Sequence, residues 1–116
     1  MFNIIDFHQF LDVHIRVGTI IKAEASVLLK KPSILLLIDF GNEIGVKKSS
    51  AQLTVNYKPN DIINKQVAAV INFKPKQIGN ILSEVLVLGF PDDNNEPILF
   101  SPDIKIKNGA RLYWIN

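Results

Sequence analysis

The spacing of apolar residues constrains the fold of this chain more than any other feature, because it changes from a helical to a strand period at Ile15. Ile15, Val17 and Thr19 alternate with polar or small residues in a run that continues to Glu24. A two-residue period places one face of a strand in a core. Gly18 lies inside this run, and we expect it to mark a bulge or a barrel corner.

Further short apolar runs, separated by turn residues, predict an all-β fold. After a break at Lys30-Lys31-Pro32, the run Ser33–Phe40 is apolar along most of its length, so we place it centrally in the sheet. More strands are predicted at Gly45–Leu53, Gln66–Phe73, Ser83–Phe90 and Ile98–Phe100, with connections at 41–43, 57–61, 74–79 and 91–97 and a last apolar segment at 104–114. Five or more short strands with little helix predict a barrel or a sandwich.

The two ends of the chain carry apolar residues that a minimal five-stranded barrel does not need. Residues 3–11 predict a short helix, with Asn3 as its N-cap and Asp6 in its first turn. Apolar termini outside a barrel are typical of a subunit interface, so we expect a homodimer. The residues assigned to this interface are Ile4, Phe7, Leu11, Leu112, Tyr113 and Trp114.

Composition excludes several classes of protein. A chain of 116 residues with 47% apolar residues fits one folded domain. Its longest apolar run, Ile34–Ile38, is far shorter than the roughly 20 residues of a membrane helix, so no membrane insertion is expected. Residues 1–12 contain no Lys or Arg, which argues against a secretory signal, and the chain has no cysteine. We therefore expect a cytoplasmic protein.

No combination of residues predicts a catalytic or cofactor site. His8 and His14 have no carboxylates placed to complete a metal site, and the acidic run 92–96 lacks the spacing of a calcium loop. Gly41 and Gly45 are not followed by the Lys and Ser/Thr of a phosphate loop. We expect no enzyme activity and no cofactor, because no credible acid, base or nucleophile set is present.

Two polar segments interrupt the apolar pattern and are candidates for ligand recognition. Residues 47–52 combine two lysines with hydroxyl and amide groups, and residues 72–77 add an amide and two more lysines before Ser83-Glu84. Ammonium, hydroxyl and amide groups bind the phosphates, riboses and base edges of RNA. Phe73 could stack on a base, but its alternation with Val67, Ala69 and Ile71 favours a place in the core.

These segments belong to a longer series of motifs. The series consists of Ile15-Arg16-Val17-Gly18-Thr19-Ile20, Ser50-Ala51-Gln52-Leu53, Tyr57-Lys58-Pro59, Asn64-Lys65-Gln66-Val67, Asn72-Phe73-Lys74-Pro75-Lys76 and Ser83-Glu84-Val85-Leu86-Val87-Leu88. In this order, from about Asp6 to Leu112, the chain resembles the tRNA-binding OB-fold domain family. The resemblance implies a five-stranded OB-fold barrel, a homodimer built from the extensions, and recognition of folded tRNA.

The resemblance also implies an organisation and a ligand face. Residues 1–116 would form one domain, with a helical extension at 1–14, a barrel core at 15–90 and a dimerisation extension at 91–116. The implied RNA-binding residues are Lys47, Lys48, Ser50, Gln52, Asn72, Lys74, Lys76, Ser83 and Glu84. His14 stands where the family usually has an acidic residue, and Gln77 stands where relatives often have a second basic residue.

Three roles stay open at this point. One branch of the family is linked to protein export and to binding of unfolded or precursor polypeptides, so the chain is expected to bind tRNA and to act as an export chaperone. Alternatively it is a polypeptide-binding chaperone for which RNA is incidental, with strand addition as a mode of binding the polypeptide. A third role is that of a separate tRNA-binding cofactor of an aminoacyl-tRNA synthetase.

Overall fold

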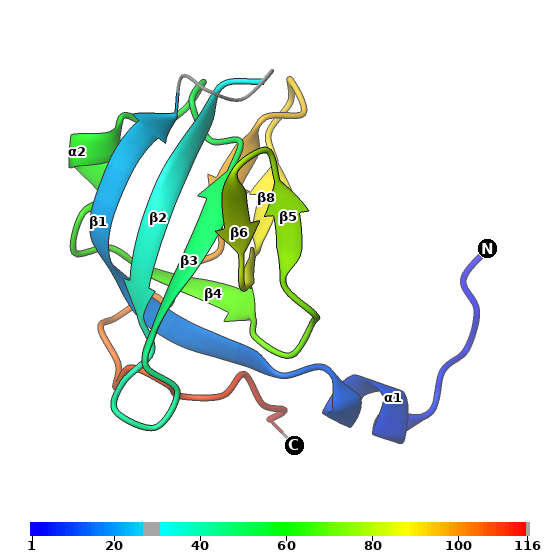
Figure 1. Cartoon of the computed structure of the whole chain (residues 1–116). Coiled ribbons are helices and arrows are strands. Elements are labelled where there is room, and N and C mark those ends of the chain that lie inside the picture. The colour runs from blue at the N-terminus through cyan, green and yellow to red at the C-terminus, as the bar shows by residue number, and fades with distance from the viewer. Residues whose placement is uncertain (27–30, 116) are drawn as a thin grey trace.

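The computed structural model describes residues 1–26 and 31–115 (Figure 1). A curled antiparallel sheet of order β3-β2-β1-β4-β7 forms the body, so the expected all-β class is confirmed. Its strands are β1 (Ile15–Ser26), β2 (Ser33–Asp39), β3 (Val46–Ala51), β4 (Gln66–Val70) and β7 (Leu86–Val87). The fold also contains two hairpins, formed by β5 (Lys76–Ile78) with β6 (Ile81–Ser83) and by β8 (Gly89–Pro91) with β9 (Pro97–Leu99). It has two short helices, α1 (Phe7–Asp12) and α2 (Pro59–Ile62).

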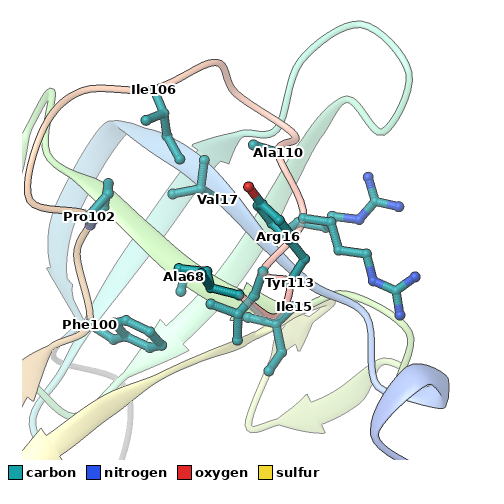
Figure 2. A pocket seen from close by; sticks show the side chains of 12 residues that line it. Ile15, Arg16, Val17, Ala68, Phe100, Pro102, Ile106, Ala110 and Tyr113 are labelled. Carbon is teal, nitrogen blue, oxygen red and sulfur yellow. The ribbon is translucent and has the colours of Figure 1, made fainter. Parts of the chain in front are cut away.

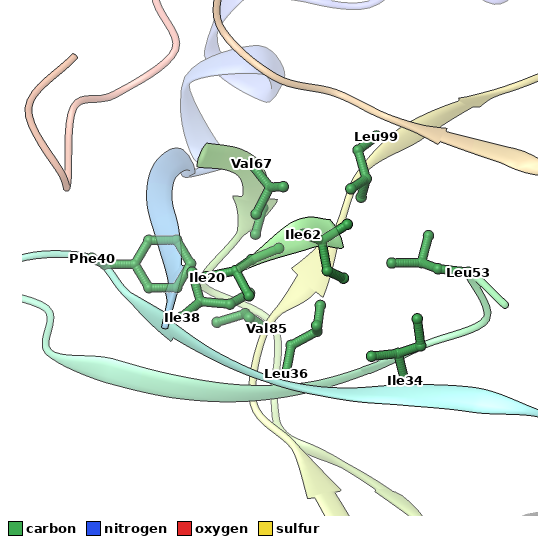
Figure 3. Packing of buried hydrophobic residues seen from close by; sticks show 11 residues of the cluster. Ile20, Ile34, Leu36, Ile38, Phe40, Leu53, Ile62, Val67, Val85 and Leu99 are labelled. Atoms are coloured by element: carbon green, nitrogen blue, oxygen red, sulfur yellow. The ribbon is translucent and has the colours of Figure 1, made fainter. Parts of the chain in front are cut away.

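The core lies inside the curl of the sheet. Strand β2 has a neighbour on each side, as its apolar run predicted, and Ile34, Leu36 and Ile38 point from it into the core (Figure 3). Because successive side chains of a strand face opposite sides, these three alternate with the partly exposed Leu35 and Leu37. The other buried members of the cluster are Ile20, Phe40, Leu53, Ile62, Val67, Ala69, Val85 and Leu99.

The sheet curls until its two edges approach each other. A register shift between Ile20 and Lys22 produces a bulge in β1, and bulges increase the local bend and twist of a strand. At the seam, the Glu84 N–H donates to the Lys48 carbonyl at 2.8 Å, and the Ser49 hydroxyl donates to the Val85 carbonyl at 3.1 Å. These bonds connect the edge strand β3 to the segment that enters β7.

Strand β4 is buried on both faces, which its sequence did not predict. Val67 and Ala69 face the core, while Ala68 and Val70 face a layer formed by the C-terminal segment. The Ala68 N–H donates to the Phe100 carbonyl at 2.8 Å. The described part of the chain contains no helix of the length and apolar character needed to cross a membrane.

Several predicted boundaries near the basic segment were wrong. Strand β4 ends at Val70, and Phe73, assigned to the core, is 58% exposed. The expected loop 74–79 contains β5, which turns at Gly79 with φ of +61° into β6. The predicted strand Ser83–Phe90 is divided among β6, β7 and β8. Its apolar residues show no clear period, and only pairing with different partners defines the breaks.

Other differences concern the glycine, the helices and the break before β2. The bulge in β1 lies between Ile20 and Lys22 and not at Gly18. Gly18 is needed for close packing, since a Cβ there would approach Ile38 Cγ2 to 2.6 Å. Helix α1 begins at Phe7, so Asp6 and not Asn3 is its N-cap. The stretch at 57–61 contains helix α2, which begins at Pro59. Of the predicted break Lys30-Lys31-Pro32 before β2, Lys30 lies outside the described residues.

Candidate nucleic-acid interface

Strand β3 divides its polar residues between two faces. Ser49 is buried, so Lys48 and Ser50 on either side of it point away from the core. Lys48 is exposed and Ser50 is half-buried. Lys47 lies on the same face as Ser49 but nearer the strand's beginning, where it is partly exposed. Gln52 follows the strand and is exposed. The four side chains predicted from this segment are therefore not all on one face.

Ser83 and Glu84 lie beside β3, as the ligand-face prediction requires, but their polar atoms are used within the chain. Ser83 is buried, and its hydroxyl accepts the Ser50 N–H at 3.2 Å. The Glu84 carboxylate accepts the Lys48 N–H at 3.0 Å. Edge strands leave backbone N–H groups unpaired, and these two side chains satisfy two of them. Both residues hold β3 in place.

The β5–β6 hairpin places a further lysine, Lys76, next to this seam. Lys76 is exposed and pairs across the hairpin with Ser83, which itself bonds to Ser50 of β3. Lys74 and Phe73 precede the hairpin and are exposed. The structure thus connects Lys76 to β3 through two successive contacts, although Lys76 is 25 or more residues from β3 in the sequence.

Asn72 occupies a structural position at the base of this hairpin. Its side-chain oxygen accepts the His14 N–H at 3.0 Å, and its amide nitrogen donates to the Asp12 carbonyl at 2.7 Å. The Ile71 N–H also donates to the His14 carbonyl at 3.0 Å. Asn72 therefore joins the end of α1 and the start of β1 to the end of β4.

The lysines near the seam have no carboxylate partner in the structure. Within residues 1–26 and 31–115, the one ion pair joins Lys22 Nζ to Glu24 Oε1 at 3.1 Å, on the exposed side of β1. Among the described residues, Lys47, Lys48 and Lys76 therefore form no ion pair, and the carboxylate at the seam, that of Glu84, bonds to the Lys48 backbone N–H. Lysines that lack an intramolecular counter-ion attract anions, including phosphates.

The acidic run 92–96 forms a hydrogen-bonded turn. The Asn56 side-chain amide donates to Asp92 Oδ2 at 3.0 Å, and Asp92 Oδ1 accepts the N–H groups of Asn94 at 2.8 Å and Glu96 at 2.9 Å. These bonds, led by the one from Asn56, lower the pKa of Asp92 below its usual value. The described residues contain no group of three or more His, Cys, Asp or Glu side chains arranged to hold a metal ion.

Three of the six residues predicted for a dimer interface, Phe7, Tyr113 and Trp114, form an aromatic cluster between the two ends of the chain. Phe7 and Trp114 pack edge to face with ring centroids 5.0 Å apart, and Tyr113 lies 6.4 Å from Trp114. Phe7, Tyr113 and Trp114 remain 52%, 69% and 42% exposed. Ile4 precedes the helix and is 99% exposed, whereas Leu11 is partly buried.

An apolar pocket of about 270 Å³ adjoins this cluster between β1, β4 and the C-terminal segment (Figure 2). Ile15, Ala68 and Phe100 line one part of it, and Ile106 and Tyr113 line another. The sequence did not predict this pocket, because it forms only where the C-terminal segment runs along β4.

Comparison with known proteins agrees with the sequence resemblance. Residues 15–111 match the family model described as "Putative tRNA binding domain". The methionine–tRNA ligase of Methanocaldococcus jannaschii is 30% identical over 108 residues, which are 93% of this chain and 16% of that protein. The methionine–tRNA ligase of Pyrococcus horikoshii is 32% identical over 108 residues, 93% of this chain and 14% of that protein. The chain thus spans about a sixth of the length of the curated relatives it matches.

Two solved structures are similar over nearly their whole length. The chaperone CsaA of Bacillus anthracis has a TM-score of 0.90 and 40% identity, covering 96% of this chain and 100% of that one. The CsaA chaperone protein of Picrophilus torridus has a TM-score of 0.88 and 43% identity, covering 95% and 100%. The family model extends from Ile15, the first residue of β1, to Arg111, which pairs with β1, so the match includes the whole sheet and both hairpins. The chain therefore belongs to the tRNA-binding domain family.

Proposed function

We propose that this chain is a non-catalytic OB-fold module that binds folded tRNA. The observation that carries the proposal is the contact between β3 and the β5–β6 hairpin, each bearing lysines without a carboxylate partner in the described structure. Three sequential antiparallel strands, a short helix between β3 and β4, and the seam beside β3 support an OB-fold. In that fold, oligonucleotides bind to the face of strands 2 and 3 and to the connecting loops beside it. The β5–β6 hairpin occupies one of these connections here, between β4 and β7.

The proposed ligand face has two kinds of residue. Lys48, Lys74 and Lys76 attract phosphates, and Ser50 and Gln52 supply polar groups on the same side of the chain as Lys48. Lys47 points to the other side of β3 and adds its charge from the beginning of the strand. Ser83, Glu84 and Asn72 position these elements, since their side chains already bond to the backbone of neighbouring segments.

Phe73 is a stacking residue in this proposal. It is 58% exposed and stands between Asn72 and Lys74, directly before the hairpin. An exposed aromatic ring beside cations offers a surface on which an unpaired base stacks, with a contribution of about 1–3 kcal/mol per base. Phe73→Leu should therefore weaken tRNA binding while leaving its salt dependence unchanged.

The test is tRNA binding measured by fluorescence anisotropy as salt increases. The logarithm of the affinity should fall linearly with the logarithm of the salt concentration, because each neutralised phosphate releases counterions. Lys48→Ala and Lys76→Ala should each reduce the slope by about 0.7–0.9, the value for one phosphate contact. Lys58→Ala is the matched control, since Lys58 is an exposed lysine at the N-cap of α2. No binding of tRNA at low salt would refute the proposal.

The apolar cluster and pocket support a homodimer and a chaperone role as a second proposal. A surface with exposed Phe7, Tyr113 and Trp114 suits contact with another copy of the chain or with an unfolded polypeptide. The two similar solved structures carry the description chaperone. Light scattering should report a dimer that Trp114→Ala weakens. Suppression of aggregation of an unfolded client, and competition of that client with tRNA, would support chaperone activity linked to protein export.

A role as a tRNA-binding cofactor of a synthetase is supported by the similarity to methionine–tRNA ligases. Co-purification with a synthetase, and a lower KM for tRNA when the chain is added, would favour it. Each of these roles places the protein in the cytoplasm, where tRNA is available, and fractionation of cells would test that location.

A further inference from the structure

Arg16 and Arg111, the only arginines in the sequence, lie side by side. They form an antiparallel bridge between β1 and the C-terminal segment, and directly opposed residues in such a bridge project to the same side. The Val17 N–H donates to the Ala110 carbonyl at 3.0 Å, and the Leu112 N–H donates to the Ile15 carbonyl at 2.8 Å. Backbone bonds on both sides of the pair therefore fix the two arginines next to each other.

Neither guanidinium group has an anionic partner in the described part of the chain. Arg16 Nη1 donates to the Gly109 carbonyl at 2.9 Å, and Arg111 Nη2 donates to the Leu11 carbonyl. The Nε of Arg16 is buried without an acceptor. Each guanidinium carries five N–H donors, so most of the donors in this pair make no hydrogen bond within the described part of the chain. Adjacent like charges repel unless an anion lies between them.

A polar recess of about 650 Å³ opens in front of the pair. Besides the two arginines it is lined by Lys107, Asn42 and Asn108, with Glu43 as its one carboxylate. Its wall is made where the turn after β2 meets the C-terminal segment. Both arginines also border the apolar pocket described above, whose lining residues Figure 2 shows.

The glycines of the recess allow its two wall segments to lie close together. Gly41 and Gly109 both have φ of +90°, a conformation that residues with a Cβ rarely adopt. A Cβ at Gly109 would lie 2.6 Å from the Phe40 carbonyl oxygen, so no larger residue fits between the two segments. The close approach of backbones fixes the position of the Gly109 carbonyl, which in turn orients Arg16.

We propose that Arg16, Arg111 and Lys107 form a binding site for a phosphate monoester. Three cations and one carboxylate leave the recess with a net positive charge. This charge balances the −1.5 to −2 charge of a phosphate monoester better than the single negative charge of a diester or a carboxylate. A guanidinium fork binds phosphate oxygens in pairs, and the concave recess suits a terminal group. A free mononucleotide and the 5′ end of an RNA both carry this group. None of these residues belongs to the proposed tRNA face, so the site is additional to it.

The first experiment measures binding of AMP and adenosine by isothermal titration calorimetry. AMP should bind and adenosine should not. Arg111→Gln should weaken AMP binding about tenfold or more, because it removes charge-assisted hydrogen bonds. Lys107→Gln, at an exposed residue, should weaken it by a smaller factor and serves as the second variant where Arg111→Gln disturbs the fold. Lys58→Ala is the control and should leave AMP affinity unchanged.

The second experiment distinguishes the two sources of the phosphate. The same tRNA is compared with its 5′ phosphate and after phosphatase treatment. A preference for the phosphorylated form that Arg111→Gln abolishes assigns the RNA terminus, whereas AMP binding without such a preference assigns a free nucleotide. Absence of AMP binding, equal AMP affinity in folded Arg111→Gln, or equal binding of acetate would overturn the proposal. These outcomes are independent of tRNA binding to the lysine face, which Lys48→Ala and Lys76→Ala test.

Discussion

Replacing Gly18 by alanine should destabilise the protein by overfilling the core beneath β1. The added Cβ would lie 2.6 Å from Ile38 Cγ2 and 2.8 and 2.9 Å from two ring carbons of Phe40. Ordinary contacts begin at 3.4 Å, so Ile38 Cγ2 would have to move from 2.6 to 3.4 Å. Ile38 and Phe40 are 0% and 1% exposed, and a close-packed interior leaves them little room to move.

The expected loss of unfolding free energy follows from two opposing effects. Overpacking a core costs about 1–3 kcal/mol, while Gly→Ala restricts the unfolded chain and stabilises by about 0.4–1 kcal/mol. The net loss should be about 1–2 kcal/mol, which lowers Tm by roughly 4–8 °C for a domain of this size. Urea unfolding followed by circular dichroism measures it, with an unchanged m-value as a check that only stability has changed.

A double-mutant cycle tests the cause of this loss. Phe40→Leu removes ring carbons that the new Cβ would contact, so it should cost less in the Gly18→Ala background than in the natural chain, with a coupling of about 0.5 kcal/mol or more. An unchanged or raised stability of Gly18→Ala, or strict additivity with Phe40→Leu, would refute the packing argument for Gly18.

Two further predictions concern polar contacts. Asn72→Ala should lower the unfolding free energy by about 1–2 kcal/mol, because it removes the hydrogen bonds to His14 and Asp12, each worth about 0.5–1.5 kcal/mol. Chemical denaturation measures this loss. Unchanged stability combined with weaker tRNA binding would instead make Asn72 a direct ligand contact. Asp92→Asn should reduce stability at neutral pH, because the folded state lowers the pKa of this carboxyl through the Asn56 bond. That stabilisation is complete above the unfolded pKa of about 3.9 and is lost as the pH falls through the lower folded pKa. The stabilities of the natural and Asp92→Asn chains, measured by acid unfolding, should therefore become equal at low pH. A difference in stability that persists in strong acid would contradict this account.

The predictions that succeeded depend on local pattern. The alternation from Ile15 and the apolar run Ser33–Phe40 predicted β1 and β2, since the period of a strand follows from its geometry and needs no knowledge of its partner. The motifs between Ile15 and Leu88 predicted the family for a similar reason. Each motif is a short local segment, and the order of the motifs is read directly along the chain without knowledge of the fold.

The predictions that failed depend on contacts between distant segments. Phe73 continues the alternation of β4, yet it is exposed because Asn72 bonds to the α1–β1 junction and directs the chain outward. Ser83 and Glu84 look like ligand contacts in the sequence, and only the position of β3 beside them shows that they serve its backbone.

The sequence alone determined the class of the fold, the main strands and the family, because apolar periodicity and motif order are local properties of the chain. Tertiary structure alone decided which polar side chains remain available to a ligand. Lys76 approaches β3 through the seam, and Arg16 meets Arg111 across 95 residues of sequence, only because the sheet curls and the C-terminal segment returns to β1. A side chain's freedom to bind depends on which backbone groups lie beside it, and that is known only once the chain is folded.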